Sequence, residues 1–316
     1  MIEYESKGIS PAAAFWVLIA FMGAGLLIGT LAGAGIWVAM TGNSILNIEK
    51  DMMNPRFANA ARIFQVISVF FAFYVPAIAT ARMMSRQPFR LLGYREGFNV
   101  KQIFLALFIL LACMPIVGAL SELNQAIPLP HSATTYFHKL EDNYTNEAEA
   151  LAIIRSPMDF VFSLIVMAFL PALFEETLFR GGLQQILVKW FKKPMAAIVV
   201  ASIIFSAMHI SYYGFLGRFA LGMVLGLIYY YSGSIWLSMT AHFANNAFAV
   251  TVMYYYSTHG KPAKEALDDK AGPIWWVVPS VIVLLLLLRA FRDVSFKRKI
   301  HKIPPMDGPS IESNIA

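Results

Sequence analysis

Apolar blocks of membrane-spanning length recur along the whole chain and constrain its fold more than any other feature. The protein is 58% hydrophobic and only 14% charged over 316 residues, with a mean hydropathy of +0.60. An ordinary globular domain is far less apolar, and a helix of about 20 apolar residues crosses a bilayer. We therefore predict an all-α fold, a polytopic membrane helix bundle of about eight transmembrane helices. The expected spans are 12–40, 60–81, 103–120, 160–180, 195–210, 215–231, 235–256 and 274–291.

Lysine and arginine residues gather in alternate loops, which indicates how the chain is oriented. Cytoplasmic loops of membrane proteins hold an excess of these residues. We therefore predict a multi-pass protein of the cell membrane with both termini in the cytoplasm, and the net charge of +6 needs no nucleic-acid partner. The basic loops contain Lys7, Arg82, Arg86, Arg90, Arg95, Lys101, Lys189, Lys192, Lys193 and the tail from Arg292 to Lys302, whereas the opposite loops contain Lys50, Arg56, Lys139, Arg155, Lys261, Lys264 and Lys270.

Two features outside the spans complete this outline. The segment 121–157 is the longest stretch predicted to lie outside the membrane, on the extracytoplasmic side, where we expect it to form a lid or surface helix. Its His131 and His138 are expected to be solvated surface residues. The single cysteine, Cys113, lies in an apolar run, so an intrachain disulfide is excluded and a buried, inert thiol is expected.

Two carboxylates and a guanidinium interrupt the fourth block, which reads Leu-Pro-Ala-Leu-Phe-Glu-Glu-Thr-Leu-Phe-Arg-Gly-Gly at 170–182. A charge near the centre of a bilayer costs about 2.5–3.5 kcal/mol on insertion scales, so three of them are unsuited to face lipid. Glu176 and Arg180 are four residues apart and share a helix face, which predicts an ion pair. Glu175 lies about 100° further round the helix and has no such local partner. We expect Glu176 and Arg180 to be structural and Glu175 to be available for chemistry.

Two more polar clusters follow, Phe205-Ser-Ala-Met-His209 in the fifth block and His242-Phe-Ala-Asn-Asn246 in the seventh. His242 and Asn246 are one helical turn apart and face the same way, whereas Asn245 is turned aside and is the weaker candidate. Ser206 lies off the His209 face and is not expected to act as a nucleophile.

Sequence distance predicts that the first two clusters meet. Glu175 and His209 lie seventeen residues before and after Lys192 (192 − 175 = 17; 209 − 192 = 17). In an antiparallel hairpin that turns near Lys192, with Pro194 in the first turn of the second helix, the two side chains reach the same depth. His242 is closer to its own turn at 232–234, so it meets them only if the helices tilt or the helix around Lys189 projects from the membrane.

Two histidines, an unpaired glutamate and an asparagine suit the hydrolysis of a peptide bond. That reaction needs an activated water, a donor for the developing oxyanion and a proton for the leaving amine. Glu175 could take the proton from water, and histidine and asparagine could donate to the oxyanion. An alternative places zinc on Glu175, His209 and His242, although the His-Glu-x-x-His motif of many zinc proteases is absent. No cofactor is required by the first chemistry.

Two other classes of function remain open at this point. The chain could be a non-catalytic membrane partner, such as an immunity or scaffold protein that retains the polar residues. It could also be a proton-coupled carrier, since intramembrane carboxylates and histidines build proton relays. The confinement of the polar residues to the second half of the chain favours the hydrolase.

The three motifs Glu175-Glu176-x-x-x-Arg180, Phe205-x-x-x-His209 and His242-x-x-x-Asn246, in this order, resemble the CPBP family of intramembrane proteases. This family is related to type II CAAX prenyl endopeptidases and to bacteriocin-processing and immunity proteins. The resemblance covers roughly residues 165–255 and implies an eight-helix bundle with a water-filled cavity.

The resemblance also implies roles and partners. Glu175 would be the water-activating base, Glu176 and Arg180 its support, and His209, His242 and Asn246 catalytic or oxyanion residues. The family leaves open both a metal-free and a zinc-dependent chemistry. The expected partners are the lipid bilayer and a peptide or membrane-protein substrate; the oligomeric state and the need for a prenyl group stay open. We divide the chain into N-terminal membrane helices with a long extracytoplasmic loop (1–157), a catalytic helical core (158–258), and a final membrane helix with a basic cytoplasmic tail (259–316).

Overall fold

The computed structural model describes residues 6–151, 154, 156–260 and 273–300. Within these residues the chain is helical apart from turns and one isolated bridge between Ser6 and Ser85, which confirms the all-α prediction. The helices are α1 (Pro11–Thr41), α2 (Ile48–Met52), α3 (Ala58–Val69), α4 (Val75–Met84), α5 (Pro88–Leu91), α6 (Val100–Ala126), α7 (His131–Leu151), α8 (Pro157–Ser163), α9 (Leu170–Glu176), α10 (Gln185–Phe191), α11 (Pro194–Ala207), α12 (Phe215–Ser232), α13 (Ile235–Thr258) and α15 (Val277–Ile300).

Three π-helical segments join some of these helices into longer continuous runs. They are η3 (Phe70–Tyr74) between α3 and α4, η4 (Leu164–Phe169) between α8 and α9, and η5 (Thr177–Gln184) between α9 and α10. Short 3-10 turns complete the described helices: η1 (Ile45–Asn47), η2 (Pro55–Phe57) and η6 (Ile274–Trp276). The fourth expected span is therefore one 35-residue run, Pro157–Phe191, rather than a regular helix over 160–180.

Local sequence signals set several helix ends. Ser10 caps α1 by accepting a hydrogen bond from the Ala13 amide, and Gly42 ends the helix in the left-handed conformation with φ 71°, as is usual for a C-terminal cap. Asn99 and Gln102 form a reciprocal capping box at the start of α6. The hairpin turn predicted near Lys192 is present, since α10 ends at Phe191 and α11 begins at Pro194.

Six helical runs among the described residues are long and apolar enough to cross a membrane: Pro11–Thr41, Pro55–Met84, Val100–Ala126, Pro157–Phe191, Phe215–Ser232 and Ile274–Arg298. The polytopic bundle is thereby confirmed. The other two expected spans fall short on one count each. α11 has only 14 residues, and α13 is long enough but less apolar. The total of about eight spans therefore stays a prediction.

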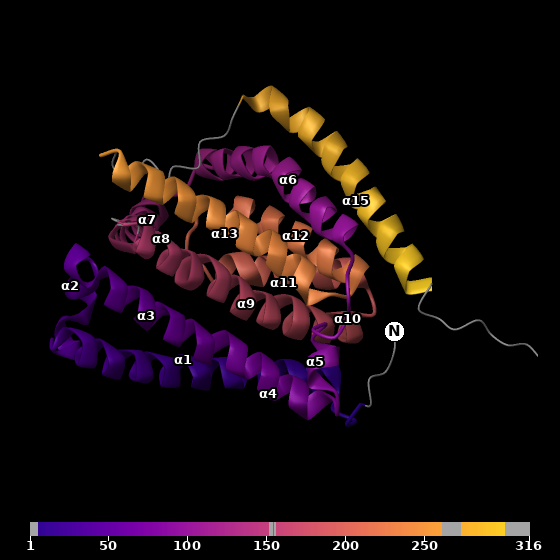
Figure 1. Ribbon diagram of the computed structural model, residues 1–316, viewed down its shortest axis with the longest axis horizontal. Helices are drawn as coiled ribbons and strands as arrows, with labels where there is room; N and C mark the ends of the chain where they lie inside the picture. The colour runs from indigo at the N-terminus through magenta and orange to yellow at the C-terminus, as the bar shows by residue number, and fades with distance from the viewer. Residues whose placement is uncertain (1–5, 152–153, 155, 261–272, 301–316) are drawn as a thin grey trace, which may run out of the picture.

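The helices pack in three layers (Figure 1). α1 packs against α3, η3 and α4 to form one layer, and α6 packs against both α12 and α15 on the opposite side. The layer between them contains α9, α11, α12 and α13, with α13 packed against η4 and α9. All three polar motifs lie in this central layer, so the lipid-facing helices on either side screen them from the bilayer.

The long loop region differs in detail from its prediction. α6 continues through Ala126, so the first six residues of the expected loop extend the membrane helix, and α7 supplies the expected surface helix. His131 and His138 are exposed as predicted, although His138 also contacts Tyr213. Cys113 is buried, as expected, at 1% exposure.

Small residues bring α1 close to its neighbour. Gly25, Gly29 and Gly33 are buried on one face of α1 against the helical run 64–72, the arrangement that small-residue spacing favours in membranes. A Cβ atom on Gly25 would overlap the backbone carbonyl of Phe71, whereas a Cβ atom on Gly23 would meet no atom within 4 Å. The two glycines therefore make a matched pair for testing this contact.

We expect Gly25→Ala to destabilise the protein by about 1–3 kcal/mol, because the backbones must separate to admit the methyl group. Gly23→Ala should leave the melting temperature unchanged or raise it slightly, because alanine favours helix over glycine by about 0.5–1 kcal/mol. Thermal unfolding of both variants in detergent measures the difference. Equal melting temperatures would show that α1 does not pack on η3 in this way.

Candidate active site

The Glu175–Glu176 pair lies where the helix changes its winding. α9 ends at Glu176, and the π-helical segment η5 begins at Thr177. Such wider turns are rare and occur mostly as local bulges, frequently at functional sites. The sequence gives no signal for this change. The prediction of which residues share a helix face uses the geometry of a regular α-helix.

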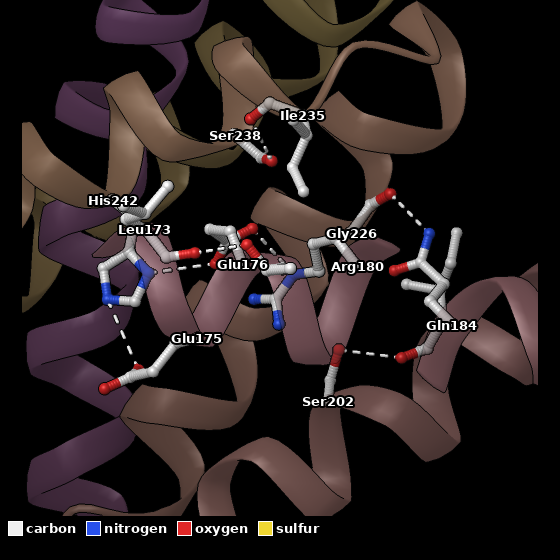
Figure 2. A network of polar contacts seen from close by, with 12 residues as sticks. Leu173, Glu175, Glu176, Arg180, Gln184, Ser202, Gly226, Ile235, Ser238 and His242 are labelled. Carbon is white, nitrogen blue, oxygen red and sulfur yellow. Dashed lines mark hydrogen bonds and ion pairs between the residues drawn. The ribbon is translucent and has the colours of Figure 1, made fainter. Parts of the chain in front are cut away.

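Glu176 is the centre of a buried ionic cluster (Figure 2). Its Oε2 lies 3.3 Å from Nε of Arg180, and the two side chains are 0% and 1% exposed. The ion pair expected from the four-residue spacing is therefore present. The other carboxylate oxygen, Oε1, lies 2.9 Å from Nδ1 of His242. This second contact, from a helix 66 residues further along the chain, could not be read from local spacing.

Glu175 faces the opposite edge of the same imidazole. Its Oε2 lies 3.8 Å from Nε2 of His242 (Figure 2), which is too far for a hydrogen bond. That oxygen is buried and has no hydrogen-bond partner among the described residues, while the side chain as a whole is 14% exposed. His242 thus stands between the two glutamates, held by one and facing the other.

His209 lies in a turn and not within a helix, which corrects the prediction that the fifth span reaches residue 210. α11 ends at Ala207, and Ile210 has φ 52°, a left-handed conformation that is unfavourable for a β-branched residue. Nδ1 of His209 lies 2.9 Å from the carbonyl oxygen of Phe205. Because a carbonyl only accepts, Nδ1 must donate the proton, and Nε2 of the neutral ring is left as an acceptor.

Phe205 connects the histidines to the ionic cluster, a role that sequence reasoning missed. Its buried ring makes edge contacts with the rings of His209 (5.0 Å between centroids) and His242 (5.9 Å). The guanidinium carbon of Arg180 lies 4.8 Å from the centre of the same ring, within the range of a cation–π interaction. One aromatic side chain therefore packs against three polar groups of the cluster.

A cavity of 1590 Å³ brings together residues of the second and third motifs. His209, His242 and Asn246 all line it, and so does Asn245, which was the weaker candidate. The Asn245 amide donates to Oδ1 of Asn246 at 3.3 Å, which leaves the Asn246 NH₂ group as a donor. Glu175 is not part of the lining and meets the cavity through His242. Ser206 is buried and donates to the carbonyl of Phe215, so it has a structural contact.

The predicted zinc ligands do not form a coordination site. In the part of the chain that the structure describes, no three His, Cys, Asp or Glu side chains are grouped so that they could hold a metal ion. The described residues thus show no metal-binding group around Glu175, His209 and His242, and the steps proposed below are written without a metal.

Comparison with known proteins supports the motif-based resemblance. Residues 157–248 match the family model described as type II CAAX prenyl endopeptidase Rce1-like. The chain is also similar to the uncharacterized protein YpbD of Bacillus subtilis (strain 168), with 34% identity over 103 residues, 31% of this chain and 50% of YpbD. The chain thus spans about half the length of this curated relative. No solved structure matches the chain.

The matched segment contains all three motifs, from the Glu175–Glu176 pair to Asn246. It also contains the whole ionic cluster and the turn that holds His209. The flanking apolar helices place this segment in a multi-pass membrane protein. Residues 157–248 of this membrane protein are therefore similar to the type II CAAX prenyl endopeptidase Rce1-like family.

Proposed function

We propose that the protein is an intramembrane endopeptidase in which Glu175 activates the water that attacks a peptide bond. The observation that supports this most directly is the contact of His242 with both glutamates beside a cavity that His209 and Asn246 also line. The family match to 157–248 agrees with a protease. The substrate would be a peptide or a segment of a membrane protein, and both chain termini would lie in the cytoplasm.

The ionic cluster is electrically neutral when it holds one exchangeable proton. Two carboxylates, one guanidinium and one imidazole sum to zero when a single proton resides on Glu175 or on Nε2 of His242. These groups face each other across 3.8 Å, whereas Glu176 is committed to Arg180 and to Nδ1 of His242. Peptide hydrolysis needs one such site, which accepts a proton from water and later gives it to the leaving amine.

The proposed cycle keeps account of that proton. With the proton on His242, Glu175 is ionised and takes a proton from water as the oxygen attacks the substrate carbonyl. The acceptor Nε2 of His209 orients the water, and the NH₂ group of Asn246 donates to the oxyanion that forms. The C–N bond then breaks as the amine takes a proton from Glu175, which restores the starting charges. Removing one hydrogen-bond donor from an oxyanion hole typically lowers the turnover number by about 10²–10³-fold.

We expect purified protein in detergent or vesicles to cleave susceptible peptides at the same rate before and after treatment with a strong chelator. The reason is that none of the proposed steps uses a metal and the predicted ligands do not converge. Mass spectrometry of a digested peptide library would identify the cleaved bonds, and metal analysis of the same sample would give its zinc content. Loss of cleavage on chelation, restored by zinc, would require a different arrangement of Glu175, His209 and His242. Absence of any cleavage would favour a scaffold or a carrier.

A further inference from the structure

The two ends of the bundle differ in charge. The turn between α4 and α6, the turn between α10 and α11, and the C-terminal part of α15 all lie at one end, which we call the basic end (Figure 1). Its described basic residues, in the loops and at the helix ends, include Arg82, Arg86, Arg90, Arg95, Lys189, Lys192, Lys193, Lys297 and Arg298. Loops at the far end, made by α2, α7 and the turn before α12, contain Lys50, Arg56 and Lys139. By the positive-inside tendency, the far end is extracytoplasmic.

The catalytic cavity opens at the far end. Its walls come from the second half of α6, beginning at Met114, from α7, from the turn before α12, and from α13 beyond His242. α6 starts at the basic end and its 27 residues rise about 40 Å, so the lining residues Gln125 and Leu129 lie at the opposite end of that helix. Apart from His242 and Phe205, which lie deeper, the lining segments therefore belong to the end opposite the basic loops.

The basic end is closed beneath the ionic cluster by the loop 92–99. Tyr94 of this loop contributes its hydroxyl to a hydrogen bond of 2.6 Å with Thr177, the residue after Glu176. Trp236 donates to the Tyr94 carbonyl at 3.0 Å, and Ser234 donates to the Glu96 carbonyl at 2.9 Å. The loop thus joins η5 to the start of α13 and covers that side of the catalytic groups.

At the far end, α7 is attached to the turn that holds His209. Phe137 stacks on Tyr212 at 4.7 Å between centroids, and Ser211 donates to Glu141 at 2.8 Å. These contacts immediately follow His209 in sequence, so a peptide that enters beside α7 reaches the proposed water-binding histidine first. α7 forms one wall of the opening rather than a separate domain.

We infer that the site receives its substrate from the extracytoplasmic side, as an extended peptide that passes beside α7 to reach His209 and His242. The cleavage of the peptide rests on the proposed function. The direction of access is argued from the cavity and the loop charges alone. The volume of 1590 Å³ exceeds the about 300–1,000 Å³ of a small-molecule pocket, which suits a peptide of several residues. Its walls mix apolar and polar side chains, with Glu141 and Arg218 as charged members.

Cysteine labelling in intact cells tests the direction of access without requiring catalysis. The native Cys113 is buried, so we expect it to react little with the label, and single cysteines can be added to the natural sequence. Gln125→Cys places a thiol at the opening and Val117→Cys places one deeper on the same wall. Lys50→Cys on α2 and Lys193→Cys in the α10–α11 turn are exposed controls at the two ends.

A membrane-impermeant maleimide added to intact cells should label Lys50→Cys, Gln125→Cys and Val117→Cys, whereas Lys193→Cys should react only after permeabilisation. The inference would be overturned if the cavity cysteines reacted only after permeabilisation. It would also be overturned if they did not react at all while Lys50→Cys did. Exclusive labelling of Lys193→Cys from outside would reverse the orientation and overturn it as well. If labelling is as expected but a peptide supplied outside is never cleaved, the proposed protease function fails while the direction of access stands.

Discussion

Glu175→Gln is expected to lower the turnover number by about 10² to 10⁴-fold, the usual loss when a general base is removed, with little change in melting temperature. Glutamine keeps the size of the side chain but cannot take a proton from water. The Oε2 atom of Glu175 makes no hydrogen bond within the described structure, so its replacement breaks no hydrogen bond of that atom. The measurements are a reporter-peptide cleavage rate and a thermal unfolding curve on the same preparation.

Glu49→Gln is the matched control for this experiment. Glu49 lies exposed on α2, remote from the ionic cluster, and the same change of charge there should leave both cleavage and melting temperature as in the unmodified protein. If Glu175→Gln cleaves at the unmodified rate, Glu175 is not the base, and another group must activate the water. A large fall in melting temperature would instead assign Glu175 a structural role.

The sequence predicted the parts of the molecule that depend on composition and local spacing. Apolar blocks predicted the helical bundle, because a helix satisfies its own backbone hydrogen bonds in lipid. The four-residue spacing predicted the Glu176–Arg180 ion pair, which is present. The lysines at 192–193 followed by Pro194 predicted the hairpin between α10 and α11, whose ends lie where expected.

The parts that sequence reasoning missed depend on contacts between distant segments. Nothing local indicates that His242 would contact Glu176 across 66 residues of sequence, or that Phe205, four residues from His209, would also touch His242. The winding change after Glu176 and the left-handed Ile210 were also unforeseen, because no proline or glycine stands at either position. The early end of α11 was missed with them, since the turn at Ile210 moves His209 out of the helix.

We expect Arg180→Ala to destabilise the protein strongly, because Arg180 belongs to the buried ionic cluster. Removing the guanidinium would leave the fully buried Glu176 carboxylate without its Arg180 partner, although His242 would still contact it. Breaking one side of a buried ion pair typically costs about 3–5 kcal/mol, because the remaining charge stays desolvated without its partner. Glu176→Gln should destabilise the protein in the same way, through the orphaned Arg180, and should harm stability more than chemistry.

A double variant separates an unpaired charge from a loss of packing. Glu176→Gln combined with Arg180→Met removes both charges while keeping similar side-chain volumes, so we expect it to unfold at a higher temperature than either Glu176→Gln or Arg180→Ala. The exposed Arg86 provides the control, because Arg86→Ala removes the same kind of charge at the surface and should change stability little. Thermal unfolding in one detergent compares all four variants. An Arg180→Ala midpoint equal to that of Arg86→Ala would mean that water reaches Glu176, and the cluster would then not be the dry, fixed support that the proposed chemistry of His242 and Glu175 requires.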